Sequence, residues 1–192
     1  MDSIWNRMWR AAKLENALYE EVEANTALTG QAITVVIIVA IAGAIGGIIS
    51  ALIGGGAGAG VIIGGLIGPP LSALIGYFVW AGVSLIVGKA LGGTADYGEM
   101  LRALGYANSP NVLAILSFIP IVGGLIAFIG AIWALVAGIV ALRQALDFST
   151  GKAIVTAIIG WIALMIVFAI IAAILAAMGL AGAATLGLLG GM

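Results

Sequence analysis

Three long stretches without a charged residue constrain this chain more than any other feature. They cover residues 24–88, 103–142 and 153–192 of a sequence of 192 residues. A charge is costly in hydrocarbon, and about 20 apolar helical residues span a bilayer, so runs of this length are typical of membrane-spanning helices. Only 8% of the residues are charged, where a soluble domain has about a quarter. The sequence therefore predicts an all-α, polytopic membrane protein whose solvent is the lipid bilayer.

Glycine and proline divide these runs into five predicted spans. The first run is long enough for two crossings, and the glycine-rich segment 54–60 marks the turn between them. In the second run, Pro120 and the pair Gly123-Gly124 predict a break near 121–125. The five predicted spans are residues 31–53, 61–88, 109–122, 125–146 and 153–178. They form one membrane domain, residues 29–192, behind an N-terminal segment of residues 1–28.

The third predicted span is too short for an ordinary crossing. At the rise of an α-helix, residues 109–122 reach only about 21 Å, less than the hydrocarbon thickness of about 30 Å. This segment must thin the bilayer, lie partly inside the bundle or form a re-entrant hairpin. The glycine- and alanine-rich tail, residues 179–192, has too few bulky residues for a further span.

Lysine and arginine indicate the orientation of the chain, because they concentrate in the cytoplasmic loops of membrane proteins. With five spans, all of them fall on one side of the membrane. They are Arg7, Arg10, Lys13, Lys89, Arg102, Arg143 and Lys152. A single crossing by residues 103–142 would place Lys89 and Arg102 on the side opposite Arg143 and Lys152. We therefore expect five spans, a cytoplasmic N-terminus and an external C-terminus.

Residues 3–23 are predicted to form one amphipathic helix that lies in the membrane interface. Ile4, Met8 and Val22 share one broad sector with two tryptophans, whereas the basic side chains point elsewhere. Tryptophan favours the headgroup level, and basic side chains are attracted to anionic lipid. The predicted interfacial anchor consists of Trp5, Trp9, Arg7, Arg10 and Lys13. The acidic second half of the helix leaves docking of a basic partner as an alternative.

The loop before the third span is predicted to contain a short helix. Asp96 can cap its first turn and Glu99 stands three residues later, the spacing of a capping box. This helix and the next cytoplasmic loop supply a candidate surface for a partner protein. The candidate interaction residues are Arg102, Tyr106, Arg143 and Lys152.

Small residues recur at four-residue spacing within the predicted spans. Such stripes let helices approach closely in lipid, where apolar burial alone does not hold them together. The candidate helix-packing residues are Gly43, Gly47, Gly60, Gly64, Gly68, Gly130 and Gly138. They predict contacts inside the bundle, or self-assembly where a stripe faces outward.

The sequence offers little material for catalysis. It contains no histidine and no cysteine, which excludes histidine bases, thiolate nucleophiles and nearly all zinc sites. No phosphate-binding loop, no charge in mid-span and no basic patch for nucleic acid is found. We therefore expect a protein that is no enzyme and needs no metal or cofactor.

Two blocks of the sequence resemble a known family. They are GKALGGTADYGEMLRALGYANSPNVL and IWALVAGIVALRQALDFSTGKAIVTAIIGWI, and YEEVEANTALTGQA precedes the first span. The chain resembles the Yip domain family, the Ypt/Rab-interacting membrane proteins, in its prokaryotic branch. This resemblance implies five spans with a cytoplasmic N-terminus, in the plasma membrane of a prokaryote. Eukaryotic relatives are linked to Rab GTPases, but this chain has a short N-terminal region and lacks their Asp-Leu-Tyr-Gly-Pro motif, so a GTPase partner is not expected.

Three functions are compatible with these observations. The first is a non-enzymatic scaffold that recruits partners or forms a homo-oligomer in the membrane. The second is a channel or small-molecule transporter, because the Pro69-Pro70 pair and the short third span suggest broken helices that line a cavity. The third is an accessory subunit of a larger membrane complex.

Overall fold

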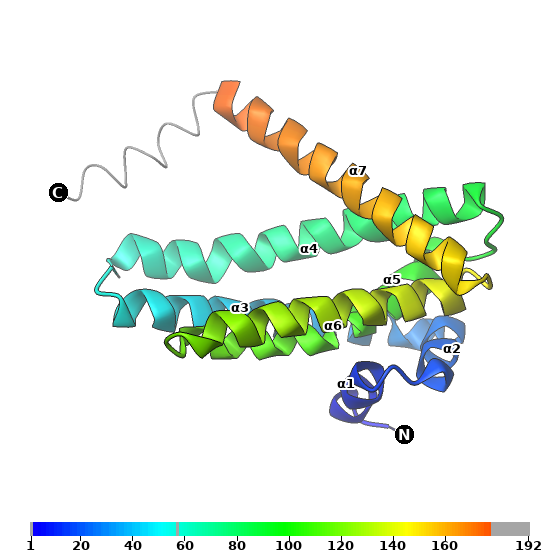
Figure 1. Ribbon diagram of the computed structural model, residues 1–192, viewed down its shortest axis with the longest axis horizontal. Coiled ribbons are helices and arrows are strands. Elements are labelled where there is room, and N and C mark those ends of the chain that lie inside the picture. Colours follow the sequence, from blue (N-terminus) through cyan, green and yellow to red (C-terminus); the bar gives the residue numbers. More distant parts are fainter. Residues whose placement is uncertain (1, 57, 178–192) are drawn as a thin grey trace.

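A bundle of long apolar helices forms most of the molecule (Figure 1). The computed structural model describes residues 2–56 and 58–177, and within these residues all regular structure is helical. Four helices are long and apolar enough to cross a membrane: α3 (Thr29–Ile53), α4 (Ala59–Ala90), α6 (Val122–Ala145) and α7 (Thr150–Ala177). Each matches a predicted span to within a few residues. The chain is thus a membrane protein, and its C-terminal tail lies outside the described residues.

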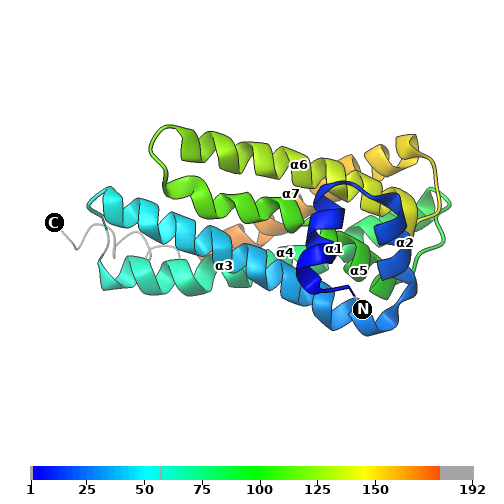
Figure 2. The same cartoon turned by 90° about the horizontal axis from the view of Figure 1, so that it is seen from below.

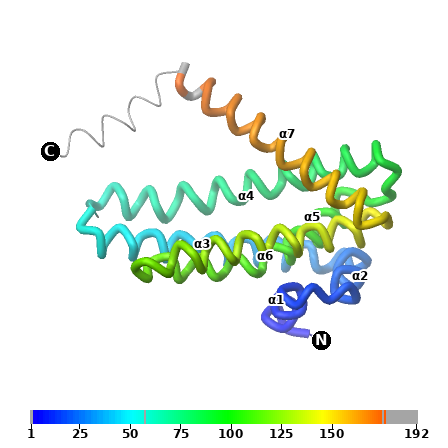
Figure 3. Tube along the Cα trace, viewed as in Figure 1, coloured from blue at the N-terminus to red at the C-terminus, as the bar shows by residue number. Residues whose placement is uncertain are grey.

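The long helices form two layers. In one layer, the short helix η2 (Ser109–Phe118) lies between α3 and α6 (Figure 2). In the other, α4 packs against α3, and α7 crosses α4 near the end where α7 begins. From that crossing α7 diverges toward its own C-terminal end (Figure 3). Pro69 and Pro70 lie inside α4 without interrupting it, which differs from the break suggested by the sequence.

The third predicted span is not confirmed as a crossing. It forms the 3₁₀ helix η2, whose 10 residues reach about 20 Å at about 2 Å per residue. The turn that follows it stops short of the turn between α3 and α4 (Figure 1). Ile121 has φ 69° in this turn, and the amide of Val122 donates to the carbonyl of Pro120 at 2.8 Å, which makes a γ-turn. Four helices are therefore long enough to cross, and η2 and α6 form a hairpin that begins and ends at the same end of the bundle (Figure 2).

The N-terminal segment differs from the single helix predicted for residues 3–23. It forms α1 (Ile4–Ala12), α2 (Asn16–Ala24) and the short η1 (Thr26–Leu28). Leu14 adopts φ 61°, and its amide donates to the carbonyl of Ala11 while the amide of Glu15 donates to that of Arg10. This pair of bonds is a Schellman motif, which ends α1 and turns the chain. The sequence carries no glycine or proline there, so the break was not predicted.

At one end of the bundle, α1 and α2 pack with α5 (Tyr97–Ala107), and we call these three helices the cap (Figures 1 and 2). The capping box predicted for α5 is confirmed, because Asp96 and Glu99 each accept from the other's backbone amide. The largest fully buried side chains lie mainly in or against the cap: Leu18, Tyr19, Met100, Leu104, Tyr106, Leu142 and Leu146. The main hydrophobic core therefore centres on the cap.

Candidate functional site: the cap and the cavity beside it

The basic residues of the predicted anchor are bound within the cap. Arg7 contacts Glu21 at 2.9 Å, and Arg10 contacts the other oxygen of Glu21 at 2.7 Å. Lys13 contacts Glu15 at 2.6 Å. Burial opposes ionisation of Glu21, but the hydrogen bonds from Arg10 and Arg7 hold its pKa below the usual range. These cations join α1 to the acidic residues near and within α2, so their charges are paired within the cap, and contact of Arg7 and Arg10 with anionic lipid stays a prediction.

The aromatic residues of the predicted anchor are exposed. Trp5 and Trp9 expose 63% and 66% of their surface. Trp9 borders an almost wholly apolar cavity of about 330 Å³ between α1, η2 and α6, and Trp133 lies on its other side. The indole of Trp133 donates to the carbonyl of Ala12 at 2.6 Å, which fixes α1 against α6. This groove is suited to apolar lipid chains, so the two exposed tryptophans remain candidates for an interfacial anchor.

Arg102 and Tyr106 do not form an exposed interaction surface. Arg102 is 4% exposed, and its Nε donates to the carbonyls of Val22 at 2.9 Å and Glu23 at 3.0 Å. Tyr106 is fully buried and donates to Gln31, and burial raises its pKa to about 12. The prediction is wrong for both residues, because α5 is enclosed by α2, α3 and α6.

Arg143 and Lys152 remain accessible near the same end of the molecule. Arg143 is partly exposed, and its Nε donates to the side chain of the adjacent Gln144 at 2.9 Å. Lys152 is exposed and donates to the carbonyl of Leu91 at 2.8 Å, which ties the start of α7 to the end of α4. These two residues are the part of the predicted surface that a partner can reach.

One carboxyl group of the cap lies in an unfavourable environment. Oxygen Oε2 of Glu23 is buried and has no hydrogen-bond partner among the described residues. Burial, followed by repulsion from Glu20, Asp147 and Glu99, raises the pKa of Glu23 to about 7, while Arg102 opposes the rise. No group of three or more potential ligand side chains in the described residues is arranged to hold a metal ion. The Glu23 carboxyl and the three acidic residues that repel it are therefore a source of electrostatic strain within the cap.

The structure separates the candidate packing glycines into two groups. A Cβ at Gly43, Gly130 or Gly138 would contact a neighbouring segment within 4 Å. Nothing lies within that distance for Gly47, Gly60, Gly64 and Gly68. Seven glycines outside the candidate set pack more tightly, because an added Cβ would lie 2.9 Å or less from a neighbouring atom: Gly46, Gly88, Gly93, Gly98, Gly105, Gly123 and Gly160. A four-residue spacing thus marked some helix contacts and missed the closest ones.

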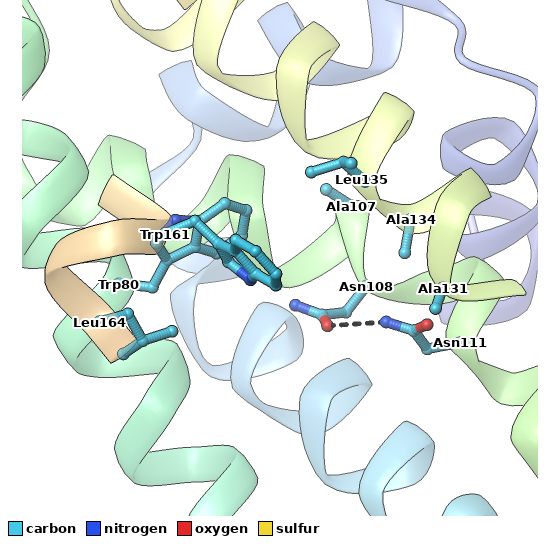
Figure 4. Close-up of a pocket in the computed structure, with 9 residues that line it drawn as sticks. All are labelled: Trp80, Ala107, Asn108, Asn111, Ala131, Ala134, Leu135, Trp161 and Leu164. Carbon is cyan, nitrogen blue, oxygen red and sulfur yellow. Dashed lines mark hydrogen bonds between the residues drawn. The ribbon is translucent and has the colours of Figure 1, made fainter. Parts of the chain in front are cut away.

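Two neighbouring cavities of about 200 and 270 Å³ lie between the membrane helices. Their linings share four residues: Trp80, Asn108, Asn111 and Leu164. The first opens along α6 and α7, and the second along α3 and α4. Figure 4 shows the first, with the indoles of Trp80 and Trp161 on one side and both carboxamides beside them. We call the two together the bilobed cavity.

Trp80 sits as a wedge between two glycines at the edge of this cavity. A Cβ on Gly138 of α6 would lie 3.0 Å from Cη2 of the indole, and one on Gly160 of α7 would lie 3.3 Å from its Nε1. That nitrogen and the hydroxyls of Ser84 and Thr156 are buried without a hydrogen-bond partner in residues 2–56 and 58–177. Glycine is needed at both contact points because the indole fills the space that a side chain would take.

The two asparagines form the polar part of the bilobed cavity. Asn111 donates to the carboxamide oxygen of Asn108 at 3.4 Å, and Asn108 donates to the carbonyl of Leu104 at 3.1 Å. No charged side chain of the described chain lines either lobe. No sequence pattern marks these residues as a site, although they are two carboxamides in a run without charge.

A family model described as Yip1 domain matches residues 16–172. This range runs from the start of α2 into α7 and includes the whole bilobed cavity. No curated protein and no solved structure gave a match. The match extends over most of the sequence and contains the LRALGYA and ALRQA blocks. The chain therefore belongs to the Yip1 domain family of membrane proteins.

Proposed function

We propose that this protein is a non-enzymatic membrane scaffold that recruits partner proteins at the cytoplasmic face of a prokaryotic plasma membrane. The proposal rests first on the rigid construction of the cap, which packs against α4 and α6 beside the proposed contact surface. Arg102 joins the last carbonyls of α2 to α5, and Arg7 and Arg10 join α1 to Glu21 of α2. A surface whose elements are fixed before binding loses little entropy when a partner docks. Membership in a family of generally non-enzymatic membrane proteins supports the same reading.

In this proposal the contact surface consists of Arg143, Lys152 and the exposed Lys89. They lie close to the end of α4, the end of α6 and the start of α7, and these helix ends are at the end of the bundle that carries the cap (Figure 1). The positive-inside rule then gives a cytoplasmic N-terminus and an external C-terminus. Because the cations of α1 are paired with carboxylates, these three residues carry most of the accessible positive charge at this end. The expected partner therefore presents acidic groups.

The experiment is site-specific photo-crosslinking of the full chain in cells. A photoreactive amino acid at Arg143 or Lys152 should give a defined crosslinked product. The matched control is Ile166 of α7, a lipid-facing position that is 55% exposed. With the probe at Arg143, loss of the product in a Lys89→Glu, Lys152→Glu double variant would support the charged surface. Equal products at Ile166 and Lys152, or no product at either Arg143 or Lys152, would refute the proposal.

Self-assembly is a second component of the proposal. Gly60, Gly64 and Gly68 recur at four-residue spacing on α4 and have open space beside them. Close approach of a second helix over such a face is the usual way in which small residues associate in lipid. We expect Gly64→Ile with Gly68→Ile to reduce the size of the detergent-purified particle. An unchanged size and stability would count against a homo-oligomer through α4.

The bilobed cavity supports small-molecule transport as a second candidate function. Polar groups inside a membrane bundle often mark a substrate path, and Asn108 and Asn111 occupy such a position. If the protein is a transporter, proteoliposomes that contain it should show flux of a solute, and the Asn111→Leu variant should abolish this flux. Flux equal to that of empty liposomes would exclude it for the solutes tested and leave the scaffold as the better reading.

A further inference from the structure

The bilobed cavity has the shape of a site for a molecule with two apolar arms. Its two lobes extend to different sides of the contact between α4 and α7, and they meet at Asn108 and Asn111. Leu135 and Trp161, at the margin of the first lobe, are 43% and 58% exposed, so this lobe is open sideways. An arm longer than the lobe can continue into the surrounding bilayer.

The chemistry of the meeting point favours an uncharged polar group. Each carboxamide nitrogen carries two hydrogens, and in the described structure each uses one of them in a hydrogen bond. The pair can therefore donate to an ester carbonyl and accept from a hydroxyl. A phosphate or ammonium group would find no opposite charge, because no ionisable side chain of the described residues lines either lobe.

The depth of the cavity strengthens this selection. Trp80 precedes Lys89 in α4 by nine residues, and Trp161 follows Lys152 in α7 by the same number, which is about 13 Å along each helix. Half of the hydrocarbon thickness is about 15 Å, so the carboxamides lie within one leaflet, below the level of the lysines. A charged headgroup is costly at such a depth, whereas a neutral one is tolerated.

We infer that the bilobed cavity binds a neutral two-chain glycerolipid of the diacylglycerol class, with its hydroxyl and ester groups at Asn108 and Asn111 and one acyl chain in each lobe. The lipid enters between α6 and α7, where the helices diverge (Figure 3). This inference is independent of the proposed scaffold, because it uses none of the three residues Lys89, Arg143 and Lys152 that would contact a partner protein.

The test uses the full-length protein in phosphatidylcholine nanodiscs. The probe is a diacylglycerol with a photoreactive diazirine on one acyl chain, compared with a phosphatidic acid that carries the same chains. We expect the diacylglycerol probe to label peptides that contain Ala134 and Leu164 about tenfold more strongly than the phosphatidic acid, a difference of about 1.4 kcal/mol. Equal labelling by the two probes would overturn the inference and indicate ordinary annular lipid.

Variants locate the binding site. Ala134→Phe fills the first lobe, and Asn111→Leu removes a carboxamide, so each should reduce labelling about tenfold. The matched control is Val136→Phe, which adds a phenyl ring to a 41% exposed position of α6 outside the cavity and should leave labelling unchanged. Equal loss in all three variants, or none in Ala134→Phe, would contradict the assignment. If the lobe variants fail to fold, competition on the wild type decides, because only a specific site is saturated by unlabelled diacylglycerol.

Discussion

The cap and the outer part of the membrane bundle are held together by different forces. In the cap, Tyr19, Met100 and Tyr106 are fully buried and Arg102 binds backbone carbonyls. We call the part of α7 after Trp161 and the part of α4 before Gly76 the outer half. There Ile63, Ile67 and Ile166 are each more than half exposed, and only 11% of the most apolar part of α7 is buried, against 39% for that of α3.

This contrast reflects the two solvents. At the water-facing end, burial of apolar surface and pairing of charges stabilise contacts. In lipid, exposure of an isoleucine costs no free energy, so helices associate only where small residues allow close contact. Variants in the cap should therefore change stability strongly, and matched variants in the outer half should change it little.

The largest effect is expected for Arg102→Met. This substitution leaves the carbonyls of Val22 and Glu23 buried without their donor, which should cost about 3 kcal/mol of unfolding free energy. Unfolding in detergent by a denaturant titration measures the change. The control is Arg143→Met, a partly exposed position that should change stability by less than about 0.5 kcal/mol. Similar losses in both variants would show that Arg102 has no special role.

The next largest change in stability is expected from a matched pair of glycine substitutions. A Cβ at Gly105 would lie 2.8 Å from the Cβ of Ala32 and 2.9 Å from its carbonyl oxygen, so Gly105→Ala should cost about 2 kcal/mol. Gly64→Ala in the outer half meets no atom within 4 Å and should be neutral or stabilising by up to about 1 kcal/mol. Thermal unfolding of the two variants measures both. A loss at Gly64 as large as at Gly105 would place a close contact on the outer face of α4.

Stability should also depend on pH through Glu23. Its pKa in the folded protein is about 7, above the ordinary value of 4.5, so folding favours the protonated carboxyl. The corresponding stability is complete below about pH 4.5 and is lost as the pH rises through 7. Glu15 and Glu21, whose pKa values are lowered, act in the opposite direction and lose their contribution only as the pH falls below about 4.5.

We therefore expect the wild type to unfold at a lower temperature at pH 8 than at pH 5.5. Water screens this half-exposed side chain, so the difference should be about 1 kcal/mol. Glu23→Gln should remove most of it, and Asp147→Asn, which lowers the repulsion on Glu23, should remove part. A pH dependence that is unchanged in Glu23→Gln would assign the effect to another group.

The smallest effect is expected at the turn before α6. Ile121 adopts φ 69°, which is unfavourable for a β-branched residue, and its side chain is 99% exposed. Ile121→Gly removes this strain without loss of packing and should stabilise the protein by about 0.5 kcal/mol. The control Ile132→Gly, within α6, should cost about 1 kcal/mol. Destabilisation at Ile121 would indicate that its side chain contributes to binding in the bilayer.

Some helix ends could be predicted from the sequence and others could not. The turn after α3 contains Gly55 at φ 76°, and its glycine-rich segment was identified. Leu14 and Asp147 adopt similar left-handed conformations, and their amides close the same kind of turn. Only tertiary contacts hold such residues there, so no local signal indicated the end of α1 at that point.

Charge placement could not determine the number of crossings. A pair of crossings by residues 109–146 and a hairpin that enters and leaves on one side both return the chain to the side where it started. The lysines and arginines therefore fall on the same side in either case. The short length of η2 and its position between α3 and α6 identify it as a short packed segment and not a full-length span.

The sequence by itself determined the solvent of this protein, the approximate ends of its four long helices and the gathering of its cations at one end. These features follow from charge-free length, which is a local property of the chain. The tertiary structure alone decided which face of each helix is inside, because helices that are apolar all round carry no pattern that marks a buried side. It therefore also decided that Arg102 is internal, that Gly105 is crowded and Gly64 is open, and that two asparagines meet at a cavity.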